Sequence, residues 1–276
     1  MNALQRSAII VGYELRRAIA KKWVLALIIL ALAIQILPFV VLSRLAELDI
    51  INETMWVFGV LSGQSLFVHL IAILVAGGSM SEEYEHGTAD ILLSKPITRV
   101  EYMTGKFFGG FLLVSFVEVI TTVMGVILAF AFFGPQRDLH FVPLMFVAIV
   151  YSTLLFFSIT FMFSEVLRRS TLAILMGFGI FIVSSIVGGV LSSLYSFTEE
   201  QVYMDVNKLL PTWSATTLPS SLAANLKIMP LLGNGMIELP SGDVHLATII
   251  VAIYAVIFVL LAYFRLVRSD VTKRAA

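Results

Sequence analysis

The sequence contains no cysteine and little charge. Without cysteine, disulfide bonds, thiol nucleophiles and thiolate metal sites are excluded. Only 13% of the 276 residues are charged, whereas 59% are hydrophobic and the mean hydropathy is +0.98. A water-soluble domain does not need several apolar stretches of about 20 residues. The composition therefore predicts an all-α integral membrane protein, because a backbone in lipid has to satisfy its own hydrogen bonds.

Two catalytic patterns are also missing from the sequence. There is no HExxH pair of the kind that binds zinc in metalloproteases. Gly105-Lys106 lacks the first glycine of a phosphate-binding loop, and it precedes an apolar run where such a loop would follow a strand. We therefore expect a chain that is not itself an enzyme, binds no cofactor or metal, and does not hydrolyse ATP.

The apolar runs predict six membrane-spanning helices within a single domain, residues 1–276. About 20 helical residues, each rising about 1.5 Å, cross a hydrocarbon layer of roughly 30 Å. Runs of this length that exclude charge are Trp23 to Ser43, Val57 to Met80, Phe107 to Phe133, Phe141 to Phe163, Thr171 to Tyr195, and Leu246 to Phe264.

The basic residues predict the orientation of these spans. If the N-terminus is cytoplasmic, 14 of the 18 Lys and Arg residues lie on the cytoplasmic side, and the exceptions are Arg44, Arg137, Lys208 and Lys227. The opposite orientation would invert the positive-inside rule at every loop. Both termini are therefore predicted to be cytoplasmic in a multi-pass protein of the cell membrane.

The segments outside the spans are partly apolar. In residues 1–22 an apolar stripe recurs at helical spacing, with arginines off the stripe, which predicts an amphipathic helix at the cytoplasmic interface. The alternative is a continuation of the first span into water. Residues 196–245 are too apolar for a free linker, so we expect short helices on the extracytoplasmic side. The stripe comprises Leu4, Ala8, Val11, Leu15 and Ile19.

Residues 81–106 form the most polar stretch between two spans. Ser81 can cap a helix whose first turn is acidic, which suits the positive end of the helix dipole. An apolar face at Ile91 to Leu93 follows, and Pro96 ends the helix. The pattern predicts a short, exposed, amphipathic helix that fits a partner's groove. An ordinary interfacial loop explains the local pattern equally well.

This stretch resembles the signature of the type-2 ABC transporter permease family. The shared pattern is Glu83-x-x-x-Gly87-Thr88, then Leu92-Leu93-Ser94-x-Pro96-Ile97-x-Arg99 and Gly105-Lys106. The resemblance implies an exporter built from two permeases, either identical or different, and two separate ATPase subunits that carry ATP and Mg, with no nucleic acid partner. It also implies that the polar helix couples the permease to its ATPase. The implied coupling residues are Glu82, Glu83, Glu85, Gly87, Thr88, Leu92, Leu93, Pro96 and Arg99.

Small residues recur every fourth position in the second and fifth spans. Such faces let helix backbones approach closely in lipid. The resemblance implies that these spans line the path between two permeases, whereas packing inside one subunit is the alternative. The residues concerned are Gly59, Gly63, Ser184, Ser185, Gly188, Gly189 and Ser192.

Glu118 is the only carboxylate well inside a predicted span. A charge there costs roughly 3 kcal/mol on insertion scales, so we expect a neutralised or partnered group, with Gln64 and His69 as candidate partners. Contact with substrate or protons is the alternative to a structural role. A secondary carrier and an intramembrane enzyme compete with the permease interpretation, but a lone carboxylate without a visible inverted repeat supports neither.

Overall fold

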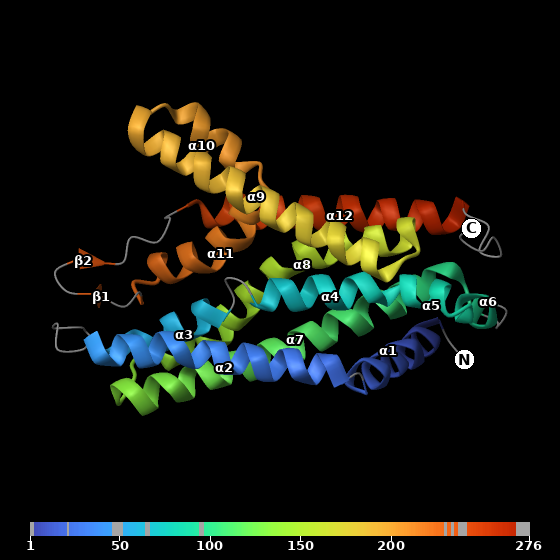
Figure 1. Cartoon of the computed structure of the whole chain (residues 1–276), viewed down its shortest axis with the longest axis horizontal. Helices are drawn as coiled ribbons and strands as arrows, with labels where there is room; N and C mark the ends of the chain where they lie inside the picture. Colours follow the sequence, from blue (N-terminus) through green and yellow to red (C-terminus); the bar gives the residue numbers. More distant parts are fainter. Residues whose placement is uncertain are drawn as a thin grey trace.

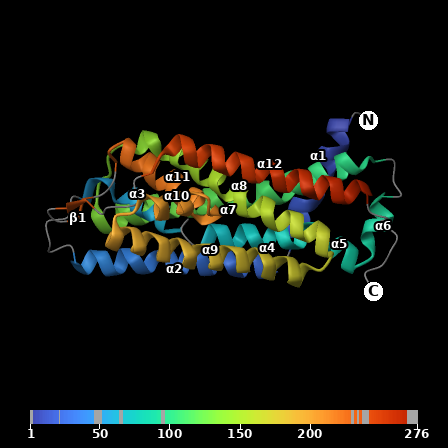
Figure 2. The same ribbon diagram turned by 90° about the horizontal axis from the view of Figure 1, so that it is seen from above.

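The computed structural model describes residues 3–20, 22–45, 52–63, 67–93, 97–228, 231–232, 235–236 and 242–268. These residues form an elongated helical bundle whose long helices run along its longest axis (Figures 1 and 2). The helices are α1 (Ala3–Ile19), α2 (Lys22–Leu45), α3 (Met55–Gly63), α4 (His69–Ser79), α5 (Ser81–Glu85), α6 (Thr88–Leu93), α7 (Arg99–Phe133), α8 (Val142–Leu167), α9 (Ser170–Thr198), α10 (Gln201–Lys208), α11 (Pro211–Asn225) and α12 (Val244–Arg268). Short turns η1 (Asn52–Thr54) and η3 (Leu139–Phe141) precede α3 and α8, and β1 (Leu231–Leu232) pairs with β2 (Gly235–Met236).

The predicted all-α membrane class is confirmed, but the span count is not. Among the described residues, five helices are long and apolar enough to cross a membrane: α2, α7, α8, α9 and α12. The predicted second span is divided between α3 and α4, each too short to cross alone, and residues 64–66 between them lie outside the described residues. Six spans therefore stay a prediction.

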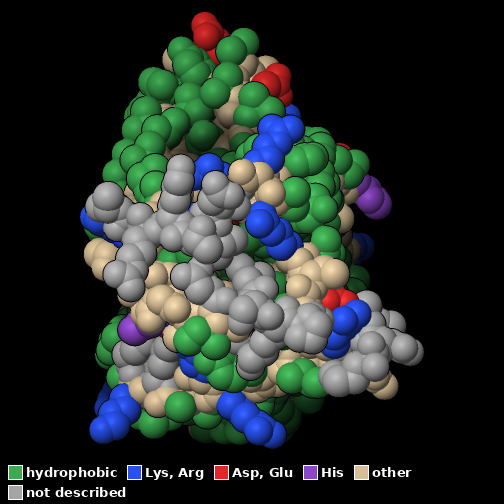
Figure 3. Space-filling view, turned by 90° about the vertical axis from the view of Figure 1, so that its right-hand side faces the viewer, with side chains coloured by type: hydrophobic (Ala, Val, Ile, Leu, Met, Phe, Trp, Pro, Cys, Tyr) green, Lys and Arg blue, Asp and Glu red, His purple; other side chains and the backbone are tan. Residues whose placement is uncertain are grey.

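The start of α1 and the end of α12 lie at the same end of the bundle, which we call the terminal end (right in Figure 1). Helices α5 and α6 lie there too, between α4 and α7. Seen from this end, Lys and Arg side chains are scattered over the surface, whereas hydrophobic side chains dominate the lobe beyond it (Figure 3).

Helix α7 extends further than the apolar run predicts. It begins at Arg99, eight residues before the predicted span, because Thr98 and Glu101 form a capping box in which each side chain accepts the other's backbone N–H. Its 35 residues correspond to about 50 Å, well beyond the roughly 30 Å of a hydrocarbon layer. The first two turns of α7 therefore lie outside the predicted span, at the terminal end.

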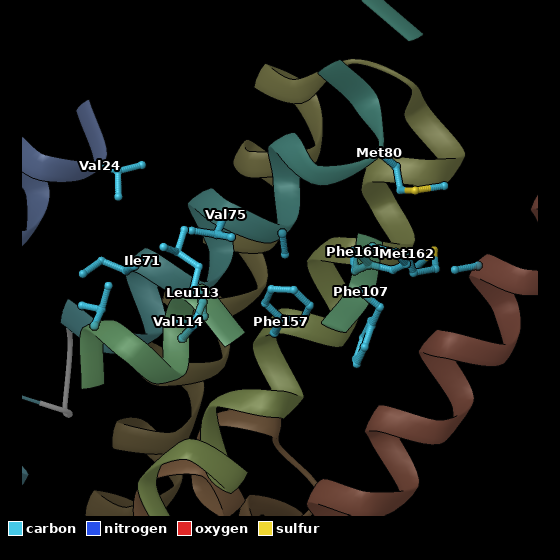
Figure 4. Close-up of a cluster of buried hydrophobic side chains, with 14 of the residues drawn as sticks. Val24, Ile71, Val75, Met80, Phe107, Leu113, Val114, Phe157, Phe161 and Met162 are labelled. Atoms are coloured by element: carbon cyan, nitrogen blue, oxygen red, sulfur yellow. The ribbon is translucent and has the colours of Figure 1, made fainter. Parts of the chain in front are cut away.

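The largest buried cluster joins α4, α7 and α8 (Figure 4). Phe107 of α7 meets Phe157 and Phe161 of α8 edge to face, with ring centroids 5.1 and 5.2 Å apart. Each such aromatic pair stabilises the fold by about 0.5–1.5 kcal/mol beyond the contribution of its buried surface area. This cluster holds α7 in place just beyond its polar first turns.

Within residues 196–245, the described part contains the short helices α10 and α11 and the strand pair β1–β2. Helix α10 and the last turns of α9 lean away from the bundle (Figure 1). Helix α11 instead is buried against α8 and α12, with Trp213 and Leu218 in a cluster with Ala148 and Ala247. This segment lies at the end of the bundle opposite the terminal end.

Candidate functional site

At the terminal end, charged side chains from three helices meet in a buried cluster that we call the polar junction. Lys106 of α7 lies at its centre and is 0% exposed. Its ammonium donates to the carboxylate of Glu83 in α5 at 2.6 Å and to that of Glu14 in α1. The rings of Tyr13 and Tyr102 lie 5.9 and 5.7 Å from the same nitrogen. The junction comprises Glu14, Arg17, Glu82, Glu83, Thr88 and Lys106.

Arg17 joins α1 to α5 from the other side of the junction. Its guanidinium donates to Glu82 at 2.6 Å and also to Glu83, so one side chain spans two neighbouring carboxylates. It lies 3.5 Å from Glu14 one turn earlier in α1. Two positive and three negative charges from α1, α5 and α7 thus neutralise one another, apart from one excess negative charge.

Glu83 is the most deeply enclosed acid of the junction. Burial alone raises the pKa of its carboxyl, but the charge and hydrogen bond of Lys106, the hydrogen bond of Thr88 and the charge of Arg17 together outweigh burial, so the net pKa lies below the ordinary range. The hydroxyl of Thr88 contributes by donating to the same carboxylate. Removing one partner of a buried pair leaves an uncompensated charge and costs about 3–5 kcal/mol. The junction therefore fixes α5 to α1 and α7.

Two glycines allow α1 to approach α7 closely. A Cβ at Gly105 would lie 2.6 Å from Ile10, and one at Gly109 would lie 2.7 Å from Glu14. Next to them, Arg6 pairs with Glu101 at 3.0 Å. Gly105 and Lys106, adjacent in the sequence, therefore have related roles: the glycine admits α1, and the lysine binds it.

The predicted exposure of Glu83 is wrong. Its side chain is 1% exposed because Arg17 and Lys106, from segments distant in sequence, enclose it. Ser81 does not cap a helix either, since α5 continues from α4 and the Ser81 hydroxyl donates to the carbonyl of Gly77.

The predicted single helix after Ser81 is two helices that meet at Gly87. This glycine has a φ of +66°, a left-handed conformation that costs glycine little. Beyond it, Ile91 of α6 is 62% exposed, so the outer surface of the segment is apolar at this point. Pro96 lies outside the described residues, as do the side chains of Leu92 and Leu93. Arg99 donates to the carbonyl groups of Leu266 and Val267 at the end of α12.

Helix α1 differs from the interfacial helix predicted for residues 1–22 in the side that it turns toward the bundle. Helix α1 forms as expected, but its stripe does not stay on one side: Leu15 packs on the core and Ile19 is exposed. Arg17, predicted to lie off the packed face, is part of the polar junction. The charged network outweighs the apolar stripe in setting the rotation of the helix.

The small residues of α9 form two ladders: Ser184, Gly188 and Ser192 in one, and Ser185, Gly189 and Ser193 in the other. The two ladders face different neighbours. A Cβ at Gly188 would lie 3.1 Å from Asn207 of α10, and Asn207 donates to Ser192 at 3.0 Å. This ladder packs inside the subunit, and Ser184 at its lower end is buried too. Gly189, by contrast, has nothing within 4 Å of a Cβ. Ser185 and Gly189 face outward.

Gly59 does not face outward. A Cβ there would lie 2.5 Å from the ring of Phe39 and 2.8 Å from the carbonyl of Gly125, so Gly59 packs between α2 and α7. Its predicted place between two permeases is corrected to a contact within one subunit. Gly63 is the last residue of α3.

Glu118 is 1% exposed and accepts hydrogen bonds from the hydroxyls of Thr121 and Thr122 at 3.1 and 3.0 Å. The expected partnering is therefore confirmed for these two hydroxyls of its own helix. Gln64 lies outside the described residues. His69 is buried between the rings of Phe156 and Phe181.

Sequence reasoning missed several functional candidates. Glu14, Arg17 and Lys106 are not among the predicted coupling residues, and of the three only Lys106 lies in the family signature. A signal for this contact is Gly105-x-x-x-Gly109 next to Lys106, the small-residue spacing that admits a neighbouring helix. Gln35 was missed entirely: it donates to the carbonyls of Gly59 and Thr121, each at 3.0 Å.

A helical bundle with five helices long and apolar enough to cross a membrane among its described residues defines a multi-pass membrane protein. The sequence profile of the family described as ABC-2 family transporter protein matches residues 8–271, which is nearly the whole chain. The chain therefore belongs to the ABC-2 family of transporter permeases, whose members are membrane subunits and not the ATPase. A search of the curated proteins found no match.

Proposed function

We propose that this chain is the permease subunit of an ATP-driven exporter and that residues 81–106 form its coupling segment, which binds a separate ATPase. The observation that carries the proposal is the polar junction. Through Lys106 and Arg17 it fixes the buried side of α5 to α7 and α1, so a force on this segment reaches the membrane helices. A flexible loop would dissipate the same force.

Ile91 is the anchor that we assign to the ATPase. It is an exposed branched side chain in the short helix α6, beyond the turn at Gly87. An amphipathic helix that places one apolar side chain in a groove is a recurring mode of protein recognition. Two ATPase subunits, which carry ATP and Mg, would serve two permeases.

The outward ladder of α9 is the surface that we assign to the second permease. Ser185, Gly189 and Ser193 lie on one side of α9 at spacings of four residues, and Gly189 leaves room for another backbone. Helix–helix association in lipid depends on such close contact. The path for the cargo would lie along this surface, in a cell-membrane protein whose terminal end is cytoplasmic. Export follows from family likeness.

Copurification with the ATPase tests the proposal. Ile91→Arg places a charge in the proposed groove and should reduce the amount of bound ATPase at least tenfold, which corresponds to about 1.4 kcal/mol. Ile19→Arg is the matched control, because Ile19 is also 62% exposed but belongs to α1 and not to residues 81–106. Failure of the unaltered chain to bind any ABC ATPase would overturn the proposal.

A further inference from the structure

The coupling segment contacts two separate parts of the bundle through neighbouring residues. Glu82 and Glu83 face the polar junction with α1 and α7. Tyr84 and Glu85, the next two residues, reach the turn between α8 and α9. Helix α5 therefore links this turn to the polar junction through side chains of its own.

Tyr84 binds the α8 side of the turn. Its hydroxyl donates to the buried carboxylate of Glu165 at 2.8 Å, and the guanidinium of Arg168 lies 4.6 Å from its ring centroid. Burial and then the charge of Glu165 raise the pKa of Tyr84 above its ordinary value, so the hydroxyl keeps its proton and stays a donor.

Glu85 binds the α9 side of the turn. One carboxylate oxygen accepts the backbone N–H of Ser170 at 2.8 Å, and the other accepts the Ser170 hydroxyl at 2.9 Å. Ser170 is the first residue of α9, and the preceding Arg169 makes no side-chain cap. The first N–H groups of a helix need an outside acceptor and favour negative charge. Helix α9 thus takes its cap from the coupling segment.

The packing of α9 makes it the helix that such a contact can move. In its most apolar stretch 17% of the residues are buried, compared with 56% in α8 on the other side of the turn. Displacing α9 therefore breaks fewer internal contacts than displacing α8.

We propose that Glu85 is a positioning residue that ties the start of α9 to the coupling segment, so that the ATPase-driven displacement of this segment is passed to α9. The inference rests on the proposed function. It assigns Glu85 a contact within the permease, in place of the contact with the ATPase that the sequence implied.

Distances between spin labels in the complex with the copurified ATPase test the inference. The chain has no native cysteine, so Val183→Cys on α9 and Val123→Cys on α7, both exposed, accept labels specifically. Labelled chain is reconstituted in nanodiscs with excess unlabelled chain, and the distance is measured without nucleotide and after trapping with ATP and vanadate. Trapping should shift the distance in the parent and in His86→Ala, an exposed neighbour, whereas Glu85→Ala should lose most of the shift.

A rescue variant distinguishes two roles of Glu85: passing the displacement of the coupling segment to α9, and stabilising the start of α9. Arg169→Asn gives α9 a cap of its own, because an asparagine side chain at this position can accept a backbone N–H of the first turn. In Glu85→Ala/Arg169→Asn, thermal stability should recover while the distance shift stays lost. A full shift in Glu85→Ala, recovery of the shift by the new cap, or no shift in a parent complex that binds and hydrolyses ATP would each overturn the inference. Absence of ATPase binding by the parent would instead overturn the proposed function, and this inference with it.

Discussion

The ammonium of Lys106 and the carboxylate of Glu83 lie 2.6 Å apart, and both side chains are almost completely buried. They belong to α7 and α5, so a single ion pair joins the longest helix of the bundle to the segment that we assign to coupling. Ion pairs at such depth are stable only as a matched set, because each charge has lost its water.

Lys106→Ala should therefore destabilise the protein by about 3–5 kcal/mol, because it removes the buried cation and leaves three carboxylates of the junction with Arg17 alone. Thermal unfolding in detergent measures the effect. Lys208→Ala is the control: Lys208 pairs with Asp205 at 2.8 Å but is partly exposed, so its loss should cost less than about 1 kcal/mol. If the two variants lose the same amount of stability, the buried pair contributes no more to stability than the exposed pair.

The close approach of α1 to α7 predicts a second result. Gly109→Leu should displace α1, since even a Cβ would lie 2.7 Å from Glu14. A disulfide between Ser7→Cys and Thr104→Cys reports the displacement, because the two native hydroxyl oxygens are 3.5 Å apart. The disulfide should form readily in the parent and poorly with Gly109→Leu.

Gly12→Ala is the matched control for that experiment, because Gly12 has nothing within 4 Å of a Cβ. It should leave cross-linking unchanged. Efficient cross-linking in Gly109→Leu would mean that α1 is not held against α7 in the way described.

The two glycines of α9 should respond differently to the same substitution. Gly188→Leu should lower thermal stability by about 1–3 kcal/mol, as overpacking does, because its side chain meets Asn207 of α10. Gly189→Leu should leave the isolated subunit stable but weaken association between permeases, measured by cross-linking in the membrane. If Gly189→Leu destabilises the subunit and leaves association unchanged, the assignment of the outward ladder is wrong.

Glu118→Gln should preserve both folding and transport. Glutamine keeps the shape and one acceptor oxygen for the hydroxyls of Thr121 and Thr122, so the cost should stay below about 1.5 kcal/mol. Thermal unfolding and substrate-stimulated ATP hydrolysis check this. A folded variant that binds its ATPase but has lost stimulated hydrolysis would assign Glu118 a role in contact with cargo or protons.

The sequence predicted what depends on local pattern and length. The apolar runs located the long helices, and the polar stretch after Met80 marked the segment between α4 and α7. It could not predict that Glu83 is buried, because burial depends on Arg17 and Lys106, which lie 66 and 23 residues away. It also could not separate Gly188 from Gly189, since only the place of α10 decides which ladder faces inward.

Cross-linking from Ile91 tests the central claim most directly. A single cysteine at this position, in a chain that has none, carries a photoreactive group, and membranes that contain the assembled transporter are irradiated. The account predicts a covalent product between this chain and an ABC ATPase, and no such product from Leu209→Cys, an exposed position at the opposite end of the bundle. A product from Leu209 and none from Ile91 would contradict it.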